Sequence, residues 1–395
     1  MANHIENCLD RRCTGCNACV AACPRDAISL KKNKEGFWYP QVDREKCVNC
    51  GLCIQGCPVY SGKEIRFLPP KSYAAWNKDD EIRKKSSSGG LFSSIADQVL
   101  RKGGVVYGAA YGEGCKVGHI RVDSPDRLWR LRSSKYVHSL ITKDIYRRVA
   151  EDLKERRVFF TGTPCQTAGM ITYCERMAPD HLDNLLTAEV LCHGVPSPKS
   201  WKEYLKEVAG DRKVVGANMR DKRNGWSKFY VSLTFEDGTE HAESFFDGVW
   251  GPSFFSNLFL RESCYECNFK RPTKMADLTL GDFWGAARED ELRKYDDADK
   301  GTSVVLVNSE KGEKLLKELE NCYLEEIPYD CLKKGLYVLY RSSNRNFHRK
   351  WAFKQLGRKP FSEIVRHTRR NTVPVMVVRK LWMTKNNVVA KFKRK

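Results

Sequence analysis

The cysteines near the start of the chain are the residues whose spacing most directly predicts chemistry. Two runs share the spacing C-x2-C-x2-C-x3-C and end at Pro24 and Pro58. Three thiolates two residues apart wrap one loop around three corners of a cubane, and the cysteine before the proline reaches the other cluster. Structural zinc, which usually uses paired C-x2-C knuckles, is the weaker alternative. The spacing predicts two [4Fe–4S] clusters, one on Cys13, Cys16, Cys19 and Cys57 and one on Cys47, Cys50, Cys53 and Cys23.

A second set of cysteines is scattered along the middle of the chain. Cys264 and Cys267 form a C-x2-C pair, Cys165 begins an expected helix, and Cys192 ends an expected strand. Sites in open α/β sheets form where strands end and helices start, and a helix N-terminus stabilises a thiolate. These four thiols predict a third [4Fe–4S] cluster. Two alternatives stay open: a zinc site, and a Cys165 nucleophile with His193 as its base.

Two regions with different sequence patterns position these cysteines. Between the two runs, Ala27–Leu30 and Phe37–Tyr39 predict a hairpin, as in a ferredoxin module. From Ser72 onward, apolar strands alternate with periodic helices, which predicts an α/β domain with a mostly parallel sheet. Phe229–Glu236 and His241–Phe246 predict an antiparallel hairpin attached to it. The other expected elements are strands at 73–76, 105–110, 119–122, 158–161, 185–191, 277–280 and 303–307, and helices at 91–101, 144–156, 201–208 and 311–319.

The predicted domain organisation has four parts. Residues 1–60 form a ferredoxin-type domain, and residues 61–71, which contain Pro69-Pro70, form a linker. Residues 72–335 form the α/β domain, and residues 336–395 form a basic C-terminal extension. The start of the chain lacks the apolar core of a signal peptide, and no run of 18 apolar residues predicts a membrane span. Cysteines in a reducing compartment serve metals or catalysis, so we expect a cytoplasmic protein.

The charge of the chain is concentrated at its end. The net charge is +20 at pH 7, and residues 364–395 contain ten Lys or Arg and no acidic residue. Basic and apolar residues interleaved with Trp382 favour peripheral contact with an anionic membrane at its inner face. The alternative is that the tail packs its apolar residues on the α/β domain. No nucleic-acid recognition motif accompanies the basic charge, so nucleic acid is not an expected partner.

Several motifs together resemble a known family. Over residues 72–310, the chain resembles the family of coenzyme F420 hydrogenase/dehydrogenase beta subunits, and the resemblance rests on Thr161–Gln166, Cys192-His193-Gly194, Cys264-x2-Cys267 and Lys274–Gly285. The resemblance implies FAD beside a [4Fe–4S] cluster and conversion between single electrons and hydride. It also implies that Cys165, Cys192, Cys264 and Cys267 are the cluster ligands.

The residues expected around the flavin do not follow a dinucleotide-binding motif, since no G-x-G-x-x-G opens a helix after a strand. Instead, Ser86–Gly90 places hydroxyls and backbone N–H groups at a helix start, which suits a pyrophosphate. An ordinary N-cap serine is the equally weighted alternative. Asn224-Gly225-Trp226 is an expected loop over the ring. The candidate flavin contacts are Ser88, Gly89, Gly90, Ser134, Lys135, Tyr136, Lys274 and Asp282.

These features predict an iron–sulfur flavoprotein oxidoreductase. Electrons would pass among the ferredoxin clusters, the third cluster and FAD, and on to a hydride carrier or an organic substrate. The carrier is F420-type, nicotinamide or another compound. A flavin is needed because clusters move one electron whereas hydride donors move two. The alternative is an electron-transfer subunit that feeds a redox partner protein and has no substrate of its own.

Overall fold

The computed structural model describes residues 3–8, 11–61, 70–271, 274–285, 290–295, 298–333 and 337–371. The α-helices are α1 Ala18–Ala21, α2 Leu52–Gln55, α3 Asp80–Lys84, α4 Leu91–Arg101, α5 Lys143–Glu155, α6 Pro164–Met177, α7 Pro198–Ala209, α8 Trp250–Phe255, α9 Glu310–Lys317, α10 Asp330–Lys333, α11 Arg349–Gln355 and α12 Phe361–Asn371. The strands are β1 Ile28–Lys32, β2 Trp38–Val42, β3 Lys71–Asn77, β4 Val105–Tyr111, β5 Val117–Val122, β6 Val158–Gly162, β7 Leu185–Val190, β8 Val214–Asp221, β9 Tyr230–Phe235, β10 Glu240–Ser244, β11 Leu278–Asp282, β12 Ser303–Val307 and β13 Cys322–Ile327.

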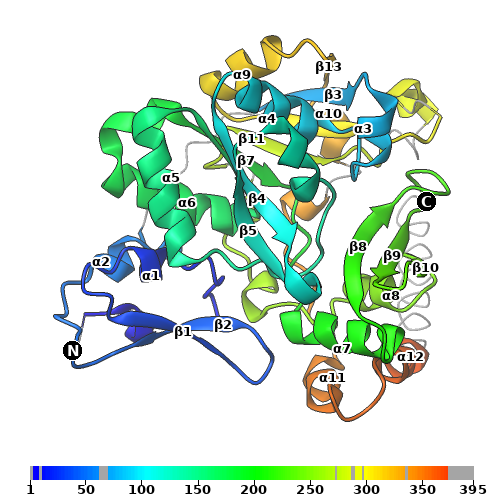
Figure 1. Cartoon of the computed structure of the whole chain (residues 1–395), viewed down its shortest axis with the longest axis horizontal. Helices are drawn as coiled ribbons and strands as arrows, with labels where there is room; N and C mark the ends of the chain where they lie inside the picture. The colour runs from blue at the N-terminus through cyan, green and yellow to red at the C-terminus, as the bar shows by residue number, and fades with distance from the viewer. Residues whose placement is uncertain are drawn as a thin grey trace, which may run out of the picture.

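The N-terminal module repeats one small unit twice. In each cysteine run a single-turn helix, α1 or α2, carries the third cysteine. Each helix starts at a residue with positive φ, Asn17 at 68° and Gly51 at 74°. These left-handed residues turn the chain sharply, so that successive cysteines face inward. Between the runs, β1 and β2 pair antiparallel from Ile28–Val42 to Lys32–Trp38, which confirms the predicted hairpin. In Figure 1 the module lies beside α5 and α6.

An eight-stranded sheet forms the centre of the larger domain, in the order β13-β3-β12-β11-β7-β6-β4-β5. The four central strands β11, β7, β6 and β4 run parallel. Antiparallel strands continue the sheet on both sides: β12, β3 and β13 beyond β11, and β5 beyond β4. The predicted α/β class is confirmed, and the parallel strands occupy the middle of the sheet (Figure 1). Strand β13 was not expected from the sequence.

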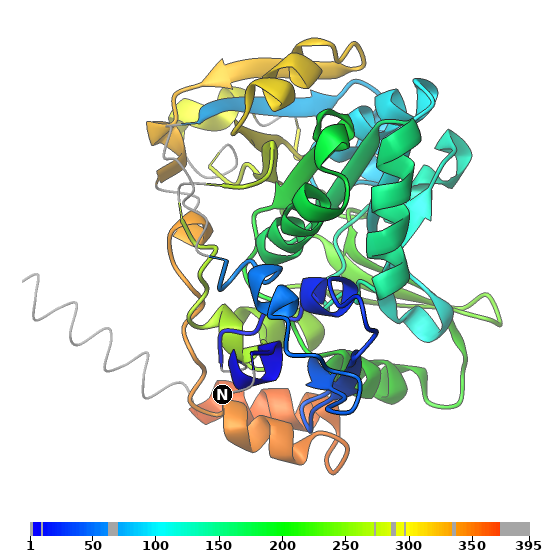
Figure 2. The same cartoon turned by 90° about the vertical axis from the view of Figure 1, so that its left-hand side faces the viewer.

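Helices cover both faces of this sheet because its strands alternate their side chains. In β4, Val106 belongs to the apolar cluster of α4 and α9, whereas Val105 and Tyr107 belong to that of α5 and α6. The second cluster also takes in Cys16 and Ala18 of the ferredoxin module. The module is therefore packed into the helical layer on α5 and α6, as Figure 2 shows.

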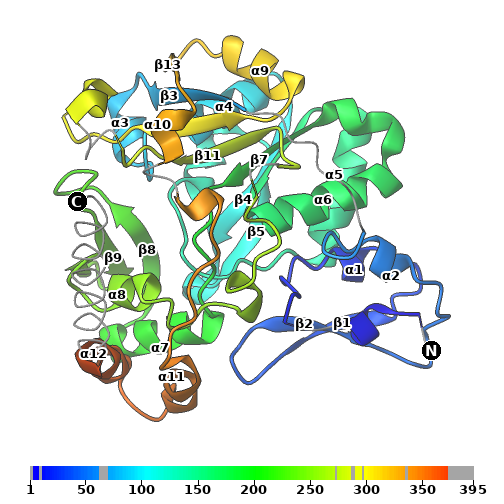
Figure 3. The same ribbon diagram turned by 180° about the vertical axis from the view of Figure 1, so that it is seen from behind.

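A smaller unit completes the fold around the three-stranded antiparallel sheet β10-β9-β8. The predicted hairpin is β9–β10, and β8, which was not expected from the sequence, extends it. Helices α7, α8, α11 and α12 share its apolar core (Figure 3). Ile364 and Val365 of α12 are buried in that core, so the first residues of the basic tail pack on the protein. Its remaining residues, and most of the predicted linker, lie outside the described residues.

Candidate redox site

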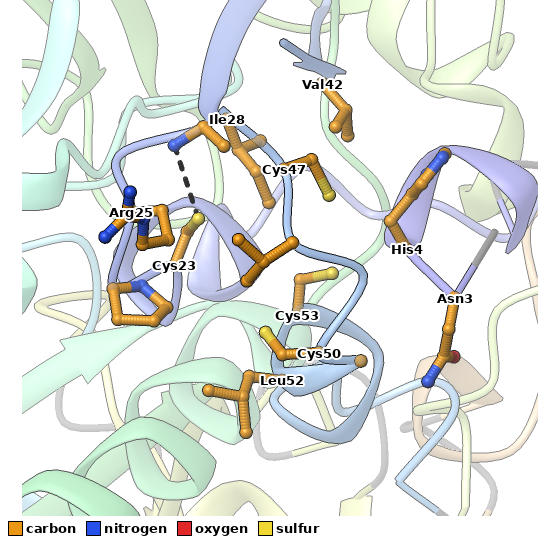
Figure 4. Close-up of a pocket in the computed structure, with 14 residues that line it drawn as sticks. Asn3, His4, Cys23, Arg25, Ile28, Val42, Cys47, Cys50, Leu52 and Cys53 are labelled. Carbon is orange, nitrogen blue, oxygen red and sulfur yellow. Dashed lines mark hydrogen bonds between the residues drawn. The ribbon is translucent and has the colours of Figure 1, made fainter. Parts of the chain in front are cut away.

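One group of thiols lines a pocket at the outer end of the ferredoxin module. Cys23, Cys47, Cys50 and Cys53 line this pocket together (Figure 4). The backbone N–H of Ala27 donates to Cys23 Sγ at 3.3 Å, and that of Ile5 donates to Cys53 Sγ at 3.2 Å. Hydrogen bonds of this kind tune cluster thiolates. Because Cys50 is exposed, this group is open to solvent.

The other ferredoxin thiols form a buried group. Burial raises the pKa of Cys57 to about 12, with further contributions from Cys16 and Cys13. Burial, followed by the charge of Cys16, raises the pKa of Cys19 well above its ordinary value. Cys57 therefore lies with the first cysteine run, just as Cys23 lies with the second. Thiols crowded in this way resist ionisation alone, and bound metal ions reverse that preference.

Helix α6 brings the buried group against the larger domain. A Cβ placed on Gly169 would lie 3.1 Å from both Cβ and Sγ of Cys16, so a side chain at this position would crowd the approach. Tyr146 of α5 donates its hydroxyl to the carbonyl of Cys16 at 2.7 Å. Gly169 follows Cys165 by four residues, so both lie on one face of α6. The first turn of α6 thus carries Cys165 next to the ferredoxin module.

The scattered cysteines converge at that turn. Burial raises the pKa of the Cys165 thiol well above its ordinary value, and Cys267, Cys192 and Cys16 raise it further. The pKa of Cys192 rises to about 11 and that of Cys264 to about 12, first through burial. Lys270 opposes the rise at Cys192, whereas Cys267 adds to it, and Cys192 adds to the rise at Cys264. The backbone N–H of Val195 lies 3.5 Å from Cys264 Sγ. The fold therefore brings together the four thiols that the sequence singled out.

The distances and burial of this set bear on the three alternatives. Among the described residues, no three His, Cys, Asp or Glu side chains lie close enough to hold a single metal ion. Thiolates around one zinc ion would lie about 3.8 Å apart, as tetrahedral Zn–S bonds of about 2.3 Å require; cubane ligands bind separate irons and stand further apart. His193 directs Nε2 to Asn257 Oδ1 at 2.5 Å. Because burial raises the Cys165 pKa, a nucleophilic thiolate is disfavoured.

A buried arginine organises a second centre. Arg220, at the end of β8, pairs with both oxygens of Asp282 at 2.8 and 3.0 Å. It also donates to the hydroxyl of Tyr136 at 3.0 Å and to the carbonyl of Ser87 at 2.5 Å. Its guanidinium lies 4.0 Å from the centroid of the Phe229 ring. Charge and aromatic surface therefore meet at one point between the two sheets.

The start of α4 lies next to this arginine. Its N-cap is Gly90, with φ 86° and no side chain to cap the helix, so the serine-cap alternative is wrong. Ser87 and Ser134 share a hydrogen bond of 2.9 Å. Lys222 donates to the carbonyls of Ser88 and Arg83, and burial lowers its pKa to about 7. Uncapped backbone N–H groups and nearby cations form a suitable setting for an anion.

Two candidate residues have other roles in the structure, and a third has a role that the sequence did not reveal. Lys274 pairs with buried Glu189 at 3.2 Å and donates to the carbonyl of Phe269 at 3.1 Å. Lys135 donates to the carbonyl of Arg132 at 2.7 Å. Gly89 is needed by the fold, since a Cβ there would collide with the carbonyl oxygen of Ala75 in β3.

Profiles of protein families match most of the chain. The "Coenzyme F420 hydrogenase/dehydrogenase, beta subunit" N-terminal profile matches residues 72–145, and the C-terminal profile matches residues 155–330. The "4Fe-4S dicluster domain" profile matches residues 12–61. The chain belongs to the family of coenzyme F420 hydrogenase/dehydrogenase beta subunits. It is an iron–sulfur protein of that oxidoreductase family, with a ferredoxin domain at its N-terminus.

Curated relatives match this beta-subunit-family chain in two ways. A subunit of the F(420)H(2) dehydrogenase of Methanosarcina mazei is 23% identical over 78% of this chain and 88% of its own length. The methylamine utilization ferredoxin-type protein MauM of Methylophilus methylotrophus is 45% identical over 16% of this chain. The chain spans only 30% of the length of MauM.

Among solved structures, a chain of the F420-reducing [NiFe] hydrogenase complex from Methanosarcina barkeri aligns with a TM-score of 0.47 at 17% identity, over 78% of this chain and 94% of its own. Separately, none of the helices in the described residues is both long enough and apolar enough to cross a bilayer.

Several residues around the scattered cysteines were not identified from the sequence. Ser342 accepts the backbone N–H of Cys267 at 2.9 Å, and Ser343 donates to the carbonyl of His193 at 2.5 Å. Lys270 donates to the carbonyls of Cys192 and Val338. These residues come from segments with no ligand-like spacing, so only their position in space reveals them.

Proposed function

We propose that the chain is an iron–sulfur flavoprotein that holds three [4Fe–4S] clusters and one FAD, and that exchanges electrons between a hydride carrier and a redox partner protein. Cys23, Cys47, Cys50 and Cys53 hold the outer cluster. The inner ferredoxin cluster and the third cluster are held by the two buried sets, Cys13, Cys16, Cys19 and Cys57, and Cys165, Cys192, Cys264 and Cys267.

The observation that carries this proposal is the position of the scattered cysteine set. Cys165, Cys192, Cys264 and Cys267 come from three separate segments, yet they influence one another and Cys16 electrostatically. A cluster in this enclosed four-thiol site would lie next to the dicluster module and could exchange electrons with it. Neither a structural zinc nor a lone nucleophile needs that neighbour.

Contacts between the chain's own residues support an arrangement of the sites in a row. The outer site includes exposed Cys50, and the inner site contacts α6 through Cys16. Beyond the third set, an aromatic series leads to Arg220: the rings of His193 and Phe254 lie 5.0 Å apart, and those of Phe254 and Tyr136 lie 4.8 Å apart. Short gaps between aromatic groups suit electron passage. The row joins the anion-binding start of α4 to the exposed outer site.

The residues present fit a flavin at the Arg220 centre. The uncapped start of α4 suits the pyrophosphate, and the Phe229 and Phe254 rings suit a flat heterocycle. Ser88, Gly89, Gly90, Ser134, Tyr136 and Asp282 belong to this centre, while Lys274 and Lys135 support the surrounding backbone. When bound, the flavin supplies the interchange between two-electron hydride and single electrons. Arg220 orients the centre through Tyr136 and Asp282.

The proposal is tested by anaerobic purification and analysis of iron, sulfide and flavin. Three four-iron clusters predict about twelve irons per chain. The double substitution Cys165→Ser and Cys267→Ser should leave about eight irons. Cys174→Ser, at a buried cysteine of α6 outside the site, is the matched control and should keep the full content. An unchanged iron content in the double variant would contradict the third cluster. Wild-type protein purified without flavin would contradict the proposed FAD.

A second candidate is an electron-transfer subunit without a substrate of its own, and exposed Cys50 favours contact with a protein partner. The two candidate functions are distinguished by mixing the isolated chain with F420H2 or NADH and following the absorbance of the flavin and the clusters. Bleaching supports the enzyme, and no bleaching until a partner is added supports the subunit.

Membrane contact of the basic tail remains a prediction. Because α12 packs on the protein through Ile364 and Val365, truncation should follow Asn371. The full and shortened chains should then sediment differently with anionic vesicles at low salt.

A further inference from the structure

Arg261 lies between two of the cysteine sets and belongs to neither. Its side chain is fully buried, and its residue is three positions before Cys264. Nε donates to the carbonyl of Cys13 at 2.8 Å, and Nη2 donates to the carbonyl of Trp38 at 3.0 Å. Nη2 also lies 3.6 Å from Cys13 Sγ. One guanidinium thus contacts a ligand of the inner ferredoxin site from the segment that carries the third set.

The charge of this arginine lacks an ordinary counterion. Among the described residues, no carboxylate forms an ion pair with it, and its Nη1 has no hydrogen-bond partner. The nearby buried arginine, Arg349, pairs with both Glu35 and Glu262. An isolated buried charge is very costly unless it is compensated. The group facing Arg261 should therefore be negative when the protein is complete.

The surroundings of Arg261 identify that group. Its guanidinium lies 4.2 Å from the Tyr39 ring centroid. A Cβ on Gly15, in the loop between Cys13 and Cys16, would lie 2.8 Å from Cζ. A cubane with four thiolate ligands carries net negative charge, which grows by one when it takes up an electron. No comparable buried cation lies among the residues that line the outer pocket.

We propose that Arg261 is a positioning residue that supplies the counter-charge of the inner ferredoxin cluster, on Cys13, Cys16, Cys19 and Cys57, and gives it a more positive reduction potential than the outer one. The inference rests on the cluster positions proposed above. A nearby positive charge and a hydrogen bond to sulfur favour the reduced state, whereas burial alone favours the oxidised state. The two ferredoxin clusters have equivalent ligand sets, so their order reports which effect wins.

The test is a potentiometric titration of the whole chain with dithionite, each cluster taking up one electron, followed by electron paramagnetic resonance. In Arg261→Gln and Arg261→Met, the inner cluster should shift to a more negative potential, and the outer one should not. Arg261→Lys keeps the charge and should recover most of the shift. Arg147→Gln removes an exposed interface cation paired with Asp26 and should change neither potential.

Unchanged potentials in Arg261→Gln and Arg261→Met, or an equal shift in Arg261→Lys, would overturn the role of the charge. Missing iron or signal in the wild-type protein would instead overturn the cluster positions, so the two failures are distinguishable. If the Arg261 variants do not accumulate, Cys50→Ser is made instead. The resonance signal that changes in Cys50→Ser then belongs to the outer cluster. The remaining ferredoxin signal must then titrate at the more positive potential, and the reverse order would overturn the proposal.

Discussion

At the scale of single residues, two buried arginines show how differently one side chain can be used. Arg261 lies between cysteine sets without a carboxylate, whereas Arg220 is matched by both oxygens of Asp282. Breaking a buried pair by removing one partner leaves an uncompensated charge, which is strongly destabilising. The Arg220 pair is therefore both a structural and a binding element.

We predict that Arg220→Gln lowers the free energy of unfolding by about 3–5 kcal/mol and empties the flavin site. The reason is that Asp282 and the Ser87 carbonyl lose the buried guanidinium, and only the Trp226 indole N–H among the described contacts still donates to Asp282. Urea denaturation and flavin content measure the two effects. Arg223→Gln is the control, because Arg223 pairs with Asp221 and Glu240 nearer the surface and should cost less than about 1 kcal/mol. Equal losses in both variants would contradict the prediction.

At the scale of elements, α6 is the part of the fold that couples the two domains. It begins at Pro164 after β6. Its Thr163 N-cap and Gln166 form a capping box, which fixes the first turn. That turn carries Cys165, and the next one presents Gly169 to Cys16. A short glycine contact thus decides how closely the ferredoxin module approaches the third cysteine set.

We predict that Gly169→Val separates these two sites, because the added atoms would collide with Cys16 and the Tyr146 hydroxyl, 3.0 Å from a Cβ at this position. Spin–spin coupling between the clusters should weaken, and iron should be lost from the inner site. Resonance spectra of the reduced protein and iron analysis provide the measurements. Gly112→Val, where a Cβ would meet only Lys116 O at 3.7 Å, should leave the coupling intact. Undiminished coupling in Gly169→Val would argue against direct contact.

At the scale of the whole molecule, the segment after residue 336 joins the domains. Arg349 of α11 donates to both oxygens of Glu35, in the turn of the ferredoxin hairpin, at 2.7 Å each. It also donates to the carbonyl of Leu260 at 3.0 Å. Figure 2 shows α11 and the module side by side. The C-terminal segment thus contacts the ferredoxin module at the turn of its hairpin.

We predict that Arg349→Met lowers the free energy of unfolding by about 2–3 kcal/mol, since charged hydrogen bonds of about this strength are lost. In a double-mutant cycle with Glu35→Gln, the two losses should not add. Lys199→Met removes a cation near the same turn, 3.4 Å from the Lys34 carbonyl, and should have little effect. Additive losses of Arg349 and Glu35 would show that the contact contributes nothing.

A pH dependence of stability follows from two buried histidines. Burial lowers the pKa of His119 to about 4, and burial together with Arg261 lowers that of His138 to about 3. Their unfolded pKa is about 6.5, so below that pH the unfolded chain binds more protons. Stability is therefore fully present above about pH 6.5 and declines as the pH falls toward 4, by up to about 1.4 kcal/mol per pH unit for each histidine.

Urea denaturation between pH 7.5 and 5 tests this dependence. His119→Gln should reduce the slope, since one of the protons that the chain takes up on unfolding is removed. His181→Gln, at the surface-lying 3-10 helix Pro179–Asn184, is the control and should keep the wild-type slope. An unaltered slope in His119→Gln would show that this histidine does not titrate on unfolding.

The sequence by itself determined everything that depends on local spacing. The two cysteine runs, the hairpin between them and helix α4 follow from residue order over a few positions, and the structure has them where expected. The alternation of strands and helices also predicted the α/β class, because periodicity of side chains is a local property. The crossing of Cys23 and Cys57 between the two runs was predictable for the same reason.

Only the tertiary structure decided what lies between these local patterns. The gathering of Cys165, Cys192, Cys264 and Cys267 was a hypothesis, because their separation in sequence fixes no distance in space. Arg261, Arg220, Ser342 and Ser343 carried no signal, since a single arginine or serine resembles any surface residue until its burial is known. The contact of Lys274 with Glu189 carried no sequence signal either, and its expected contact with a flavin stays a prediction. Spacing specifies ligands that share one loop, whereas counter-charges and domain contacts depend on packing between distant segments.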